Sequence, residues 1–342
     1  MQSRTQKNRY FALFIFGIAL VLILLCLNLA LGSVEFSLKE IWNSLLHPEL
    51  VEKYRRSIIL KIRLPRLLAA ALGGAALAVS GLLLQVFFSN PIVEPYILGV
   101  SSGANLVLAL MILGGVRFFG IKYISSWGLV GGAFVGAMLV LLLVILASRR
   151  VKSIVTLLII GMMVGYVCSA ITSVLRILAP YEAQAVFTMI TMGTFSGFTW
   201  DQVQVLYIIC IPFLLLSFAL AKPLNMMLLG DNYAKSLGLS LRKFRVLMIL
   251  FSGVLTATVT AFAGAISFIG LAVPHIVRMT YQSSDNRICL PASCIYGAAM
   301  GLACDLAARL LLPPHELPLG AITSLIGAPL VVYLLLKESQ DL

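Results

Sequence analysis

The sequence contains few charged residues, and this scarcity sets the class of protein. Charged residues make up 11% of the 342 residues, hydrophobic residues make up 61%, and the mean hydropathy is +1.03. Soluble domains carry about 25% charged residues, so this composition excludes a water-soluble globular protein. The apolar runs are too long and too uniform for barrel strands, and in lipid such runs satisfy their backbone as helices. We therefore expect an all-α, polytopic membrane protein.

Residues that carry catalysis or bind metals are also scarce. The three histidines, His47, His275 and His315, are far apart and each adjoins a proline. The six cysteines form no C-x-x-C pair and fall mostly within apolar runs, which is typical of small buried hydrophobic residues. The chain also lacks a G-x-x-x-x-G-K-S/T phosphate loop. We expect no metal site, no bound cofactor and no enzymatic activity; if transport consumes ATP, a separate subunit binds ATP and magnesium.

Apolar runs of about 20 residues, the length that crosses a bilayer, recur ten times. They lie at 11–31, 65–87, 93–114, 126–148, 153–178, 201–221, 243–264, 269–281, 290–312 and 318–336, and the eighth is unusually short. The first run follows a basic leader, but no small-residue cleavage site comes after it, so we interpret it as an uncleaved anchor. The pattern predicts a single transmembrane domain over 1–342, with ten spans and both termini on one side.

The distribution of lysine and arginine indicates which side the termini occupy. Of the 25 such residues, 14 fall on the side of the termini and 11 on the other, and 7 of those 11 lie within the segment 32–66. Outside this segment the count is 14 against 4, which by the positive-inside rule places both termini in the cytoplasm. The segment 32–66 is therefore predicted to face outward, against the usual bias.

That segment ends in KIRLPRLLAAALGG, residues 61–74, where Lys61, Arg63 and Arg66 precede an apolar run. One interpretation is a solvated mixed-charge loop with Arg66 snorkelling at the membrane surface. The other is a docking surface for a soluble partner with acidic groups, because arginine–carboxylate contacts are strong and directional. Residue chemistry alone favours the solvated loop.

The cytoplasmic segment LNMMLLGDNYAKSLGLSLRKFR, residues 224–245, carries the signals of a short helix. Asp231 is the expected N-cap and Gly238 suits the C′ position. Ala234 and Leu237 fall one turn apart between them. We predict two turns of helix that project from the membrane domain and lie in a groove of a partner. A helix resting on lipid is the alternative, but its apolar face is small.

Glycine and proline indicate how the spans meet. GLVGGAFVG, residues 128–136, spaces glycines by four, and two further glycine pairs repeat the spacing, which predicts close helix contacts. Two stretches with prolines or small polar residues, at 87–104 and 263–278, interrupt the apolar pattern. Ser101 and Ser102 in the first stretch indicate backbone close to a neighbouring helix or to a lumen.

Three long stretches resemble the permease family of bacterial ABC importers for iron chelates, haem and cobalamin, often called the FecCD family. They are RLPRLLAAALGGAALAVSGLLLQVFFSNPIVEPYILGVSSGA at 63–104, GAISFIGLAVPHIVR at 264–278 and DLAARLLLPPHELPLGAITSLIGAPLVVYLLLK at 305–337. The resemblance implies a type II ABC importer permease fold in the bacterial cytoplasmic (inner) membrane. It further implies a homodimer of ten-helix subunits in membrane lipid, seated on two ATPase subunits and served by an extracytoplasmic binding protein. No nucleic-acid partner is implied.

The resemblance also assigns docking residues. In a cobalamin-transporting member of the family, both arginines of the R-L-P-R motif and an arginine near the outer end of the ninth helix engage glutamates of the binding protein. Here this implies docking by Arg63, Arg66 and Arg309, and it reverses the preference for a solvated loop. Asp305 and Arg309, four residues apart, are also spaced to pair on one helix face.

Coupling residues follow in the same way. NYAKSLG occupies the position of the E-A-A-x-x-x-G loop of binding-protein-dependent permeases, although Asn232 departs from its glutamate. The resemblance implies that the helix seated in the ATPase groove carries Asp231, Ala234, Leu237 and Gly238.

The resemblance places the translocation path along the fifth helix and the segment after it, roughly 153–200. The candidate path residues are Arg176, Ser101, Ser102, Thr194 and Ser196. A largely apolar lumen suits the release of a large chelate that the binding protein holds. Arg176 either meets a carboxylate-bearing cargo or snorkels at the membrane surface.

These observations predict the permease of an ATP-driven importer that moves an iron chelate inward by alternating access. A ferric siderophore is the first expected cargo, with cobalamin or haem as alternatives. A secondary transporter driven by an ion gradient would need carboxylates in mid-membrane, whereas the acidic residues here lie in loops or near span ends. A membrane enzyme would need an acid–base, nucleophile or metal constellation, and none appears at workable spacing.

Overall fold

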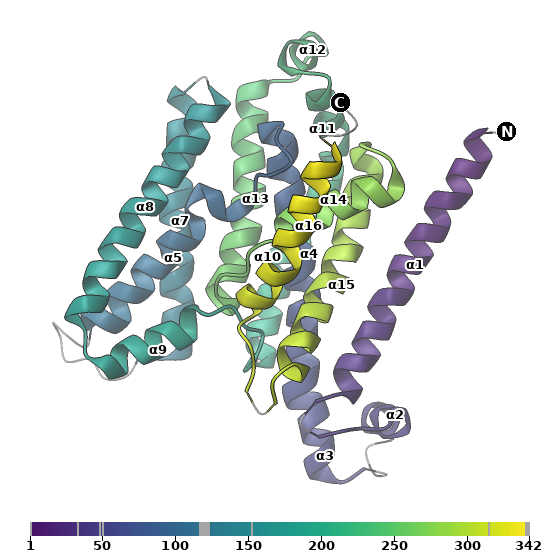
Figure 1. Ribbon diagram of the computed structural model, residues 1–342, viewed down its shortest axis with the longest axis vertical. Coiled ribbons are helices and arrows are strands. Elements are labelled where there is room, and N and C mark those ends of the chain that lie inside the picture. The colour runs from purple at the N-terminus through teal and green to yellow at the C-terminus, as the bar shows by residue number, and fades with distance from the viewer. Residues whose placement is uncertain are drawn as a thin grey trace.

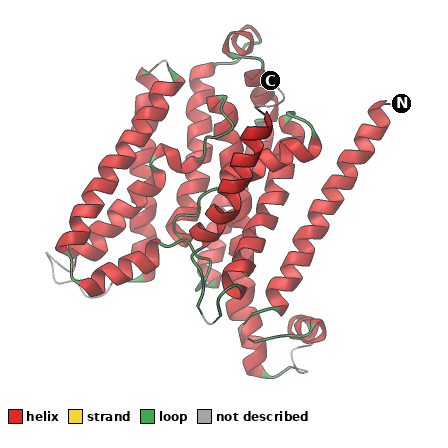
Figure 2. Cartoon of the chain, in the orientation of Figure 1, coloured by secondary structure: helices red, strands yellow, loops and turns green. Residues whose placement is uncertain are grey.

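The computed structural model of the chain describes residues 2–32, 34–47, 49, 51–115, 124–151, 153–313 and 315–338. Within these ranges helices form the regular structure, and the β-type pairing is limited to an isolated bridge between Met192 and Ala265. Figure 2 shows this arrangement as helices joined by short loops. The expected all-α fold is confirmed.

Long helices run side by side along the vertical axis of Figure 1. Seven stretches of the described chain are long and apolar enough to cross a membrane. They are α1 (Gln2–Ala30), the continuous α3 (Lys53–Ser57), η2 (Ile58–Arg63) and α4 (Leu64–Phe88), α7 (Ser126–Arg150), α8 (Ile154–Leu178), α10 (Trp200–Ala219), α13 (Leu241–Ala263) and α15 (Asn286–Leu310). The remaining three predicted spans coincide with α5 (Val100–Ala109) and η4 (Leu110–Gly114), α14 (Ile269–Tyr281) and α16 (Leu319–Glu338). Ten membrane crossings remain a prediction, because seven stretches of the described residues are long and apolar enough to span a membrane.

The molecule has two distinct ends. Helix α12 (Asp231–Ser236) stands at one end, where α1 begins and α16 finishes, and α2 (Leu38–Leu46) and α3 lie at the opposite end (Figure 1). We call these the α12 end and the α2 end. The start of α1 and the finish of α16 share one end, which is the arrangement that an even number of spans produces.

Helix α4 is the centre of the core, and nearly all of its residues are buried. It is surrounded by α10, α13, α14 and α15. Small residues allow the close approach, because a Cβ added to Gly301 of α15 would lie 2.3 Å from the carbonyl oxygen of Ala70. Likewise a Cβ on Gly136 of α7 would lie 2.2 Å from the carbonyl oxygen of Gly103. Glycine spacing therefore predicted close packing correctly at these positions, whereas a Cβ on Gly128 would meet Ile124 and Ser125, which precede its own helix.

The two interrupted stretches pack against each other beside α4. The Glu94 carboxylate accepts a hydrogen bond from the backbone N–H of Phe268 at 3.0 Å, and the Tyr96 hydroxyl accepts one from Ile266 N–H at 2.8 Å. Phe268 has φ +66°, in the left-handed region that side chains rarely adopt. Side chains from 87–104 thus satisfy backbone donors at the point where 263–278 is not yet helical.

Some short helices were not predicted from the sequence, because none of them contains an apolar run of span length. They are α2, α9 (Tyr181–Thr191) and α11 (Ala221–Leu228). Helix α2 begins with a capping box, in which Ser37 Oγ accepts from Glu40 N–H at 3.2 Å and the Glu40 carboxylate accepts from Ser37 N–H at 2.9 Å. Residues 53–66 are also helical, so the solvated-loop interpretation is wrong for this part of 32–66.

Candidate functional site

At the α2 end, Arg66 lies on the first turn of α4 and is buried. Its Nε donates to both carboxylate oxygens of Asp305 on α15, at 2.9 and 3.1 Å. Its Nη1 donates to Glu316, in the loop between α15 and α16, at 2.7 Å. Arg66 is therefore held between two carboxylates, and the snorkelling interpretation of this residue is wrong.

Arg309 and Arg63 complete this group. Arg309 Nε lies 3.5 Å from Asp305 Oδ2, which confirms the predicted pairing, and Arg309 also donates to Asn28 of α1. Arg63 is buried, donates to the backbone carbonyl oxygens of Leu29 and Val34, and lies over the Phe36 ring. We call Arg63, Arg66, Arg309, Asp305 and Glu316 the arginine cluster. The three arginines implied for docking are thus brought together, and each is held by acceptors within the chain.

Glu316 is the exposed edge of the arginine cluster. Its side chain is 42% exposed, against 8% for Arg66 and 0% for Asp305. Partial burial tends to raise the pKa of Glu316, but the hydrogen bond and positive charge of Arg66 outweigh it and hold that pKa below its ordinary value. Glu316 therefore stays ionised at neutral pH and covers the face of Arg66 nearest to solvent.

At the α12 end, α12 is shorter than predicted and starts one residue earlier than expected. Gly230 is the N-cap and Asp231 is the first helical residue, so the N-cap assignment of Asp231 is wrong. The Asp231 carboxylate instead accepts from Arg245 Nη2 of α13 at 2.7 Å. Because the backbone at Gly230 has φ +96°, glycine occupies the position where the chain turns into α12.

The other end of α12 matches the prediction. Gly238 has φ +87° and follows the Leu237 C-cap, with bonds from Gly238 N–H to the Lys235 carbonyl at 2.9 Å and from Leu239 N–H to the Ala234 carbonyl at 3.0 Å. These two bonds are those of a Schellman motif. Ala234 is fully buried, whereas Leu237 is half exposed. The side of α12 that carries Ala234 therefore packs against the rest of the chain, and the larger side chain of Leu237 faces outward.

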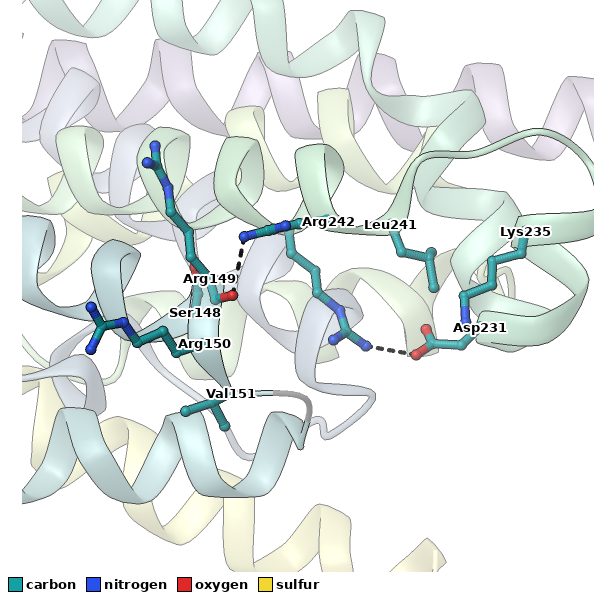
Figure 3. A pocket seen from close by; sticks show the side chains of 9 residues that line it. Ser148, Arg149, Arg150, Val151, Asp231, Lys235, Leu241 and Arg242 are labelled. Carbon is teal, nitrogen blue, oxygen red and sulfur yellow. Dashed lines mark hydrogen bonds and ion pairs between the residues drawn. The ribbon is translucent and has the colours of Figure 1, made fainter.

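A basic pocket of about 490 Å³ lies beside α12 (Figure 3). It is lined by Ser148, Arg149, Arg150, Val151, Asp231, Lys235, Leu241, Arg242 and Arg245. Figure 3 shows Arg242 reaching from α13 to the Arg149 carbonyl oxygen at the finish of α7, a distance of 3.3 Å. Sequence analysis missed this pocket because its walls come from segments about ninety residues apart. The available signal was the excess of lysine and arginine on the side of the termini.

The candidate path residues do not form one group. Ser102 of α5 lies 3.5 Å from Ser169 of α8, hydroxyl to hydroxyl. Arg176 donates to the Thr188 hydroxyl of α9 at 3.0 Å and lies over the Phe187 ring, which fixes the corner between α8 and α9.

The remaining path candidates lie apart from that corner. Thr194 follows α9, and its N–H donates to the Ala263 carbonyl at 2.8 Å. Its hydroxyl accepts from the N–H of Ser196 at 3.0 Å, and Ser196 is exposed. Ser101 is half-buried on α5. Gly99 meets Gly161 and Gly165 of α8, so the small residues of this stretch do lie against a neighbouring helix.

A bundle of apolar helices around a glycine-lined central helix, with a short helix projecting at one end, is the architecture of a multi-pass membrane protein. The chain belongs to the FecCD transport family, whose model matches residues 20–337. This is a family of ABC transporter permease subunits of the inner membrane, so the chain is a transport component. Its structure has the ABC importer permease fold.

Individual relatives agree with this assignment. The chain is 39% identical, over 281 residues, to the vitamin B12 import system permease protein BtuC of Salmonella typhi and of Salmonella newport, covering 82% of this chain and 84% of each relative. An ABC transporter of metal-chelate type, solved in an inward-facing conformation, matches with a TM-score of 0.84 and 31% identity over 97% of this chain and 99% of that one. PsaBC from Streptococcus pneumoniae shares the fold at a TM-score of 0.55 and 15% identity, over 87% of this chain and 95% of that one.

Proposed function

We propose that two copies of the chain form the membrane path of an importer that moves a metal chelate into the cell, driven by ATP hydrolysis on separate subunits. Membership of the FecCD family and the match of nearly the whole chain to a metal-chelate type transporter support this function. The buried carboxylate of Asp305 does not favour ion coupling, because Arg66 and Arg309 already neutralise it.

In this proposal the α12 end faces the cytoplasm and α12 seats in a groove of the ATPase subunit. Tyr233 and Leu237 are exposed and available to that groove, while the ion pair between Asp231 and Arg245 ties α12 to α13. Helix α13 packs on both α4 and α7. A displacement of α12 by the ATPase therefore reaches the central helix through one charged contact and two packed interfaces.

The substitution Gly238→Val tests the coupling role of α12. No atom lies within 4 Å of a Cβ added at Gly238, so the substitution causes no clash and acts only through the left-handed backbone. We expect ATP-driven uptake to fall while the permease still folds. Gly238→Asn is the matched control, because asparagine tolerates this conformation. Normal uptake by the valine variant would show that α12 is not the coupling element.

The α2 end receives the binding protein in this proposal, and Glu316 occupies the place of an incoming carboxylate. Arg66 keeps Asp305 on its other side, so a glutamate of the binding protein needs to displace only the exposed Glu316 contact. We expect Glu316→Gln to tighten association with the cognate binding protein, measured by surface plasmon resonance on nanodisc-embedded permease. Arg63, Arg66 and Arg309 engage the partner in this scheme, and unchanged or weaker association of Glu316→Gln would contradict it.

Cobalamin is the first cargo to test, because the matched Salmonella relatives are vitamin B12 permeases. A ferric siderophore, the cargo that the sequence resemblance put first, is the second, because the matched structure is of metal-chelate type. Bacteria that lack their own permeases for both cargoes should take up one of them when supplied with this chain, its ATPase and its binding protein. Uptake of radiolabelled cobalamin and of radioiron-loaded siderophore would be compared in the same cells.

The driving force is tested separately. The purified chain should show no ATPase activity alone, and the complex with its ATPase subunits should hydrolyse ATP and transport into proteoliposomes. Vanadate should stop this transport, whereas a protonophore should leave it unchanged. Transport that survives vanadate and collapses with the protonophore would establish an ion-coupled carrier instead.

A further inference from the structure

The basic pocket at the α12 end contains more positive charge than the chain neutralises. Four cations of the lining, Arg149, Arg150, Lys235 and Arg242, have no carboxylate partner among the described residues, and all four are exposed. The one acid of the lining, Asp231, is already paired with Arg245. A pocket of about 490 Å³ with this charge excess suits a compact anion, and arginine is the side chain best matched to phosphate.

Helix α7, whose last residues line this pocket, also carries an apolar stripe. Four leucines of this helix are about half exposed and recur at helical spacing: Leu139, Leu142, Leu143 and Leu146. Arg150 follows Leu146 by four residues, so it stands at the α12 end of the same helix face. From Leu139 to Arg150 the helix rises roughly 16 Å at 1.5 Å per residue, which is about half of a ~30 Å hydrocarbon core.

We infer that the basic pocket binds the phosphate headgroup of an anionic glycerophospholipid, whose acyl chains lie along the leucine stripe of α7. The headgroup meets Arg149, Arg150 and Arg242, and the chains run from Leu146 toward Leu139. Charge selects an anionic headgroup, and the stripe selects a ligand with chains of one leaflet's length. Cationic pockets between membrane helices are suited to such headgroups.

A lipid bound at this position would affect the contacts that join α7, α12 and α13. Arg242 links the start of α13 to the finish of α7, and Arg245 links α13 to α12, so the headgroup would lie against both connections. A bound phosphate adds a counter-charge at the first turn of α13, which carries arginine and lysine but no acid. The lipid therefore stabilises the junction between α7, α12 and α13.

The test titrates the purified full-length chain with lipids and follows binding by native mass spectrometry. Dioleoyl-phosphatidylglycerol is the anionic probe, and dioleoyl-phosphatidylcholine is the zwitterionic probe with the same chains. The variant R149Q/R150Q/R242Q removes three pocket cations, and K53Q/K222Q/R287Q removes three exposed cations outside the pocket. Each cation near a headgroup contributes roughly fivefold in affinity, so the pocket variant should lose about a hundredfold for phosphatidylglycerol and the control variant less than about fivefold.

Two further probes separate a lipid from a soluble anion. Dihexanoyl-phosphatidylglycerol, which has the same headgroup and short chains, should bind much more weakly than the dioleoyl form. Inorganic phosphate should not displace the dioleoyl form at equal concentration. Equal losses in the two triple variants, equal binding of both dioleoyl lipids, or displacement by inorganic phosphate would each overturn the inference.

Discussion

The arginine cluster at the α2 end and the basic pocket at the α12 end are both built mainly from arginine. They differ in the burial of those arginines and in whether carboxylates of the chain neutralise them. In the arginine cluster, Arg66 is buried and bonded to Asp305 and Glu316. In the basic pocket, Arg149 and Arg150 are exposed, without a carboxylate partner among the described residues. The first region has its counter-charges within the chain, and the second leaves them to be supplied from outside.

This difference shows that the number of cations in a segment does not decide its role. Both regions look alike in the sequence, as short runs of arginine at the edge of an apolar span. What separates them is whether another helix brings an acid to the same place. Burial also makes the internal pairing of the arginine cluster costly to disturb, because removing one partner of a buried ion pair leaves an uncompensated charge.

The largest effect is expected from Asp305→Asn, which breaks the arginine cluster. Two arginines lose their shared counter-ion in a buried site, which costs about 3 kcal/mol of unfolding free energy. Thermal unfolding in detergent would measure this loss. Asp201→Asn, at an exposed position in the first turn of α10, is the control and should change stability by less than about 0.5 kcal/mol. A loss no larger than that of the control would show that the pairing with Asp305 is not needed for folding.

A smaller effect is expected from Asp231→Asn, which removes the only acid of the basic pocket. The pair with Arg245 is partly exposed, so its loss should cost about 1 kcal/mol, equivalent to roughly fivefold in an equilibrium. The variant should bind phosphatidylglycerol more tightly and couple ATP hydrolysis to uptake less well. If both readouts match the wild type, the ion pair neither fixes α12 nor tunes the charge of the pocket.

Glu316→Gln should destabilise less still, because Glu316 is partly exposed and Arg66 keeps its bond to Asp305. The folded-state pKa of Glu316 is below its ordinary value, so its contribution is present above about pH 4.3 and is lost as the pH falls through the folded-state pKa. The wild type should be more stable than the variant at neutral pH by less than about 1 kcal/mol. The two melting curves should converge once the pH is below the folded-state pKa of Glu316, and a difference that persists in strong acid would contradict this assignment.

The smallest effect on stability is expected from R149Q/R150Q/R242Q in lipid-free detergent. Arg149 and Arg150 are exposed and make no ion pair among described residues, so the melting temperature should move by no more than about 2 °C. Added phosphatidylglycerol should raise the melting temperature of the wild type but not of this variant. A large loss in lipid-free detergent would place these arginines with the arginine cluster, as structural residues.

Sequence patterns predicted the parts of this molecule that local chemistry determines. The eighth apolar run, 269–281, coincides with α14 at both ends, and Gly238 has the left-handed backbone that its C′ position required. Both follow from residues within one or two turns of each other. The secondary structure of the basic stretch before Arg66 was harder to predict, because its charged residues interrupt the apolar pattern of a helix that runs continuously from Lys53 to Phe88.

Features that depend on contacts between residues far apart in the sequence could not be predicted from it. Arg66 is separated from Asp305 by 239 residues, so no local pattern could show that Arg66 is buried rather than displayed. Asp231 was predicted as an N-cap on local grounds, yet its carboxylate is used by Arg245 on another helix. The basic pocket depends in the same way on α7 and α13 meeting in space.

The distance in sequence between Arg66 and Asp305 also bears on biogenesis. When the ribosome has delivered α4 to the bilayer, its arginine has no counter-ion, because α15 has not yet been made. An unpaired guanidinium is costly inside lipid, so α4 must wait near the surface or beside water and reach its final depth only when α15 arrives. A chain terminated before residue 305 would leave the central helix without its late partner, as an unfinished substrate for membrane proteases.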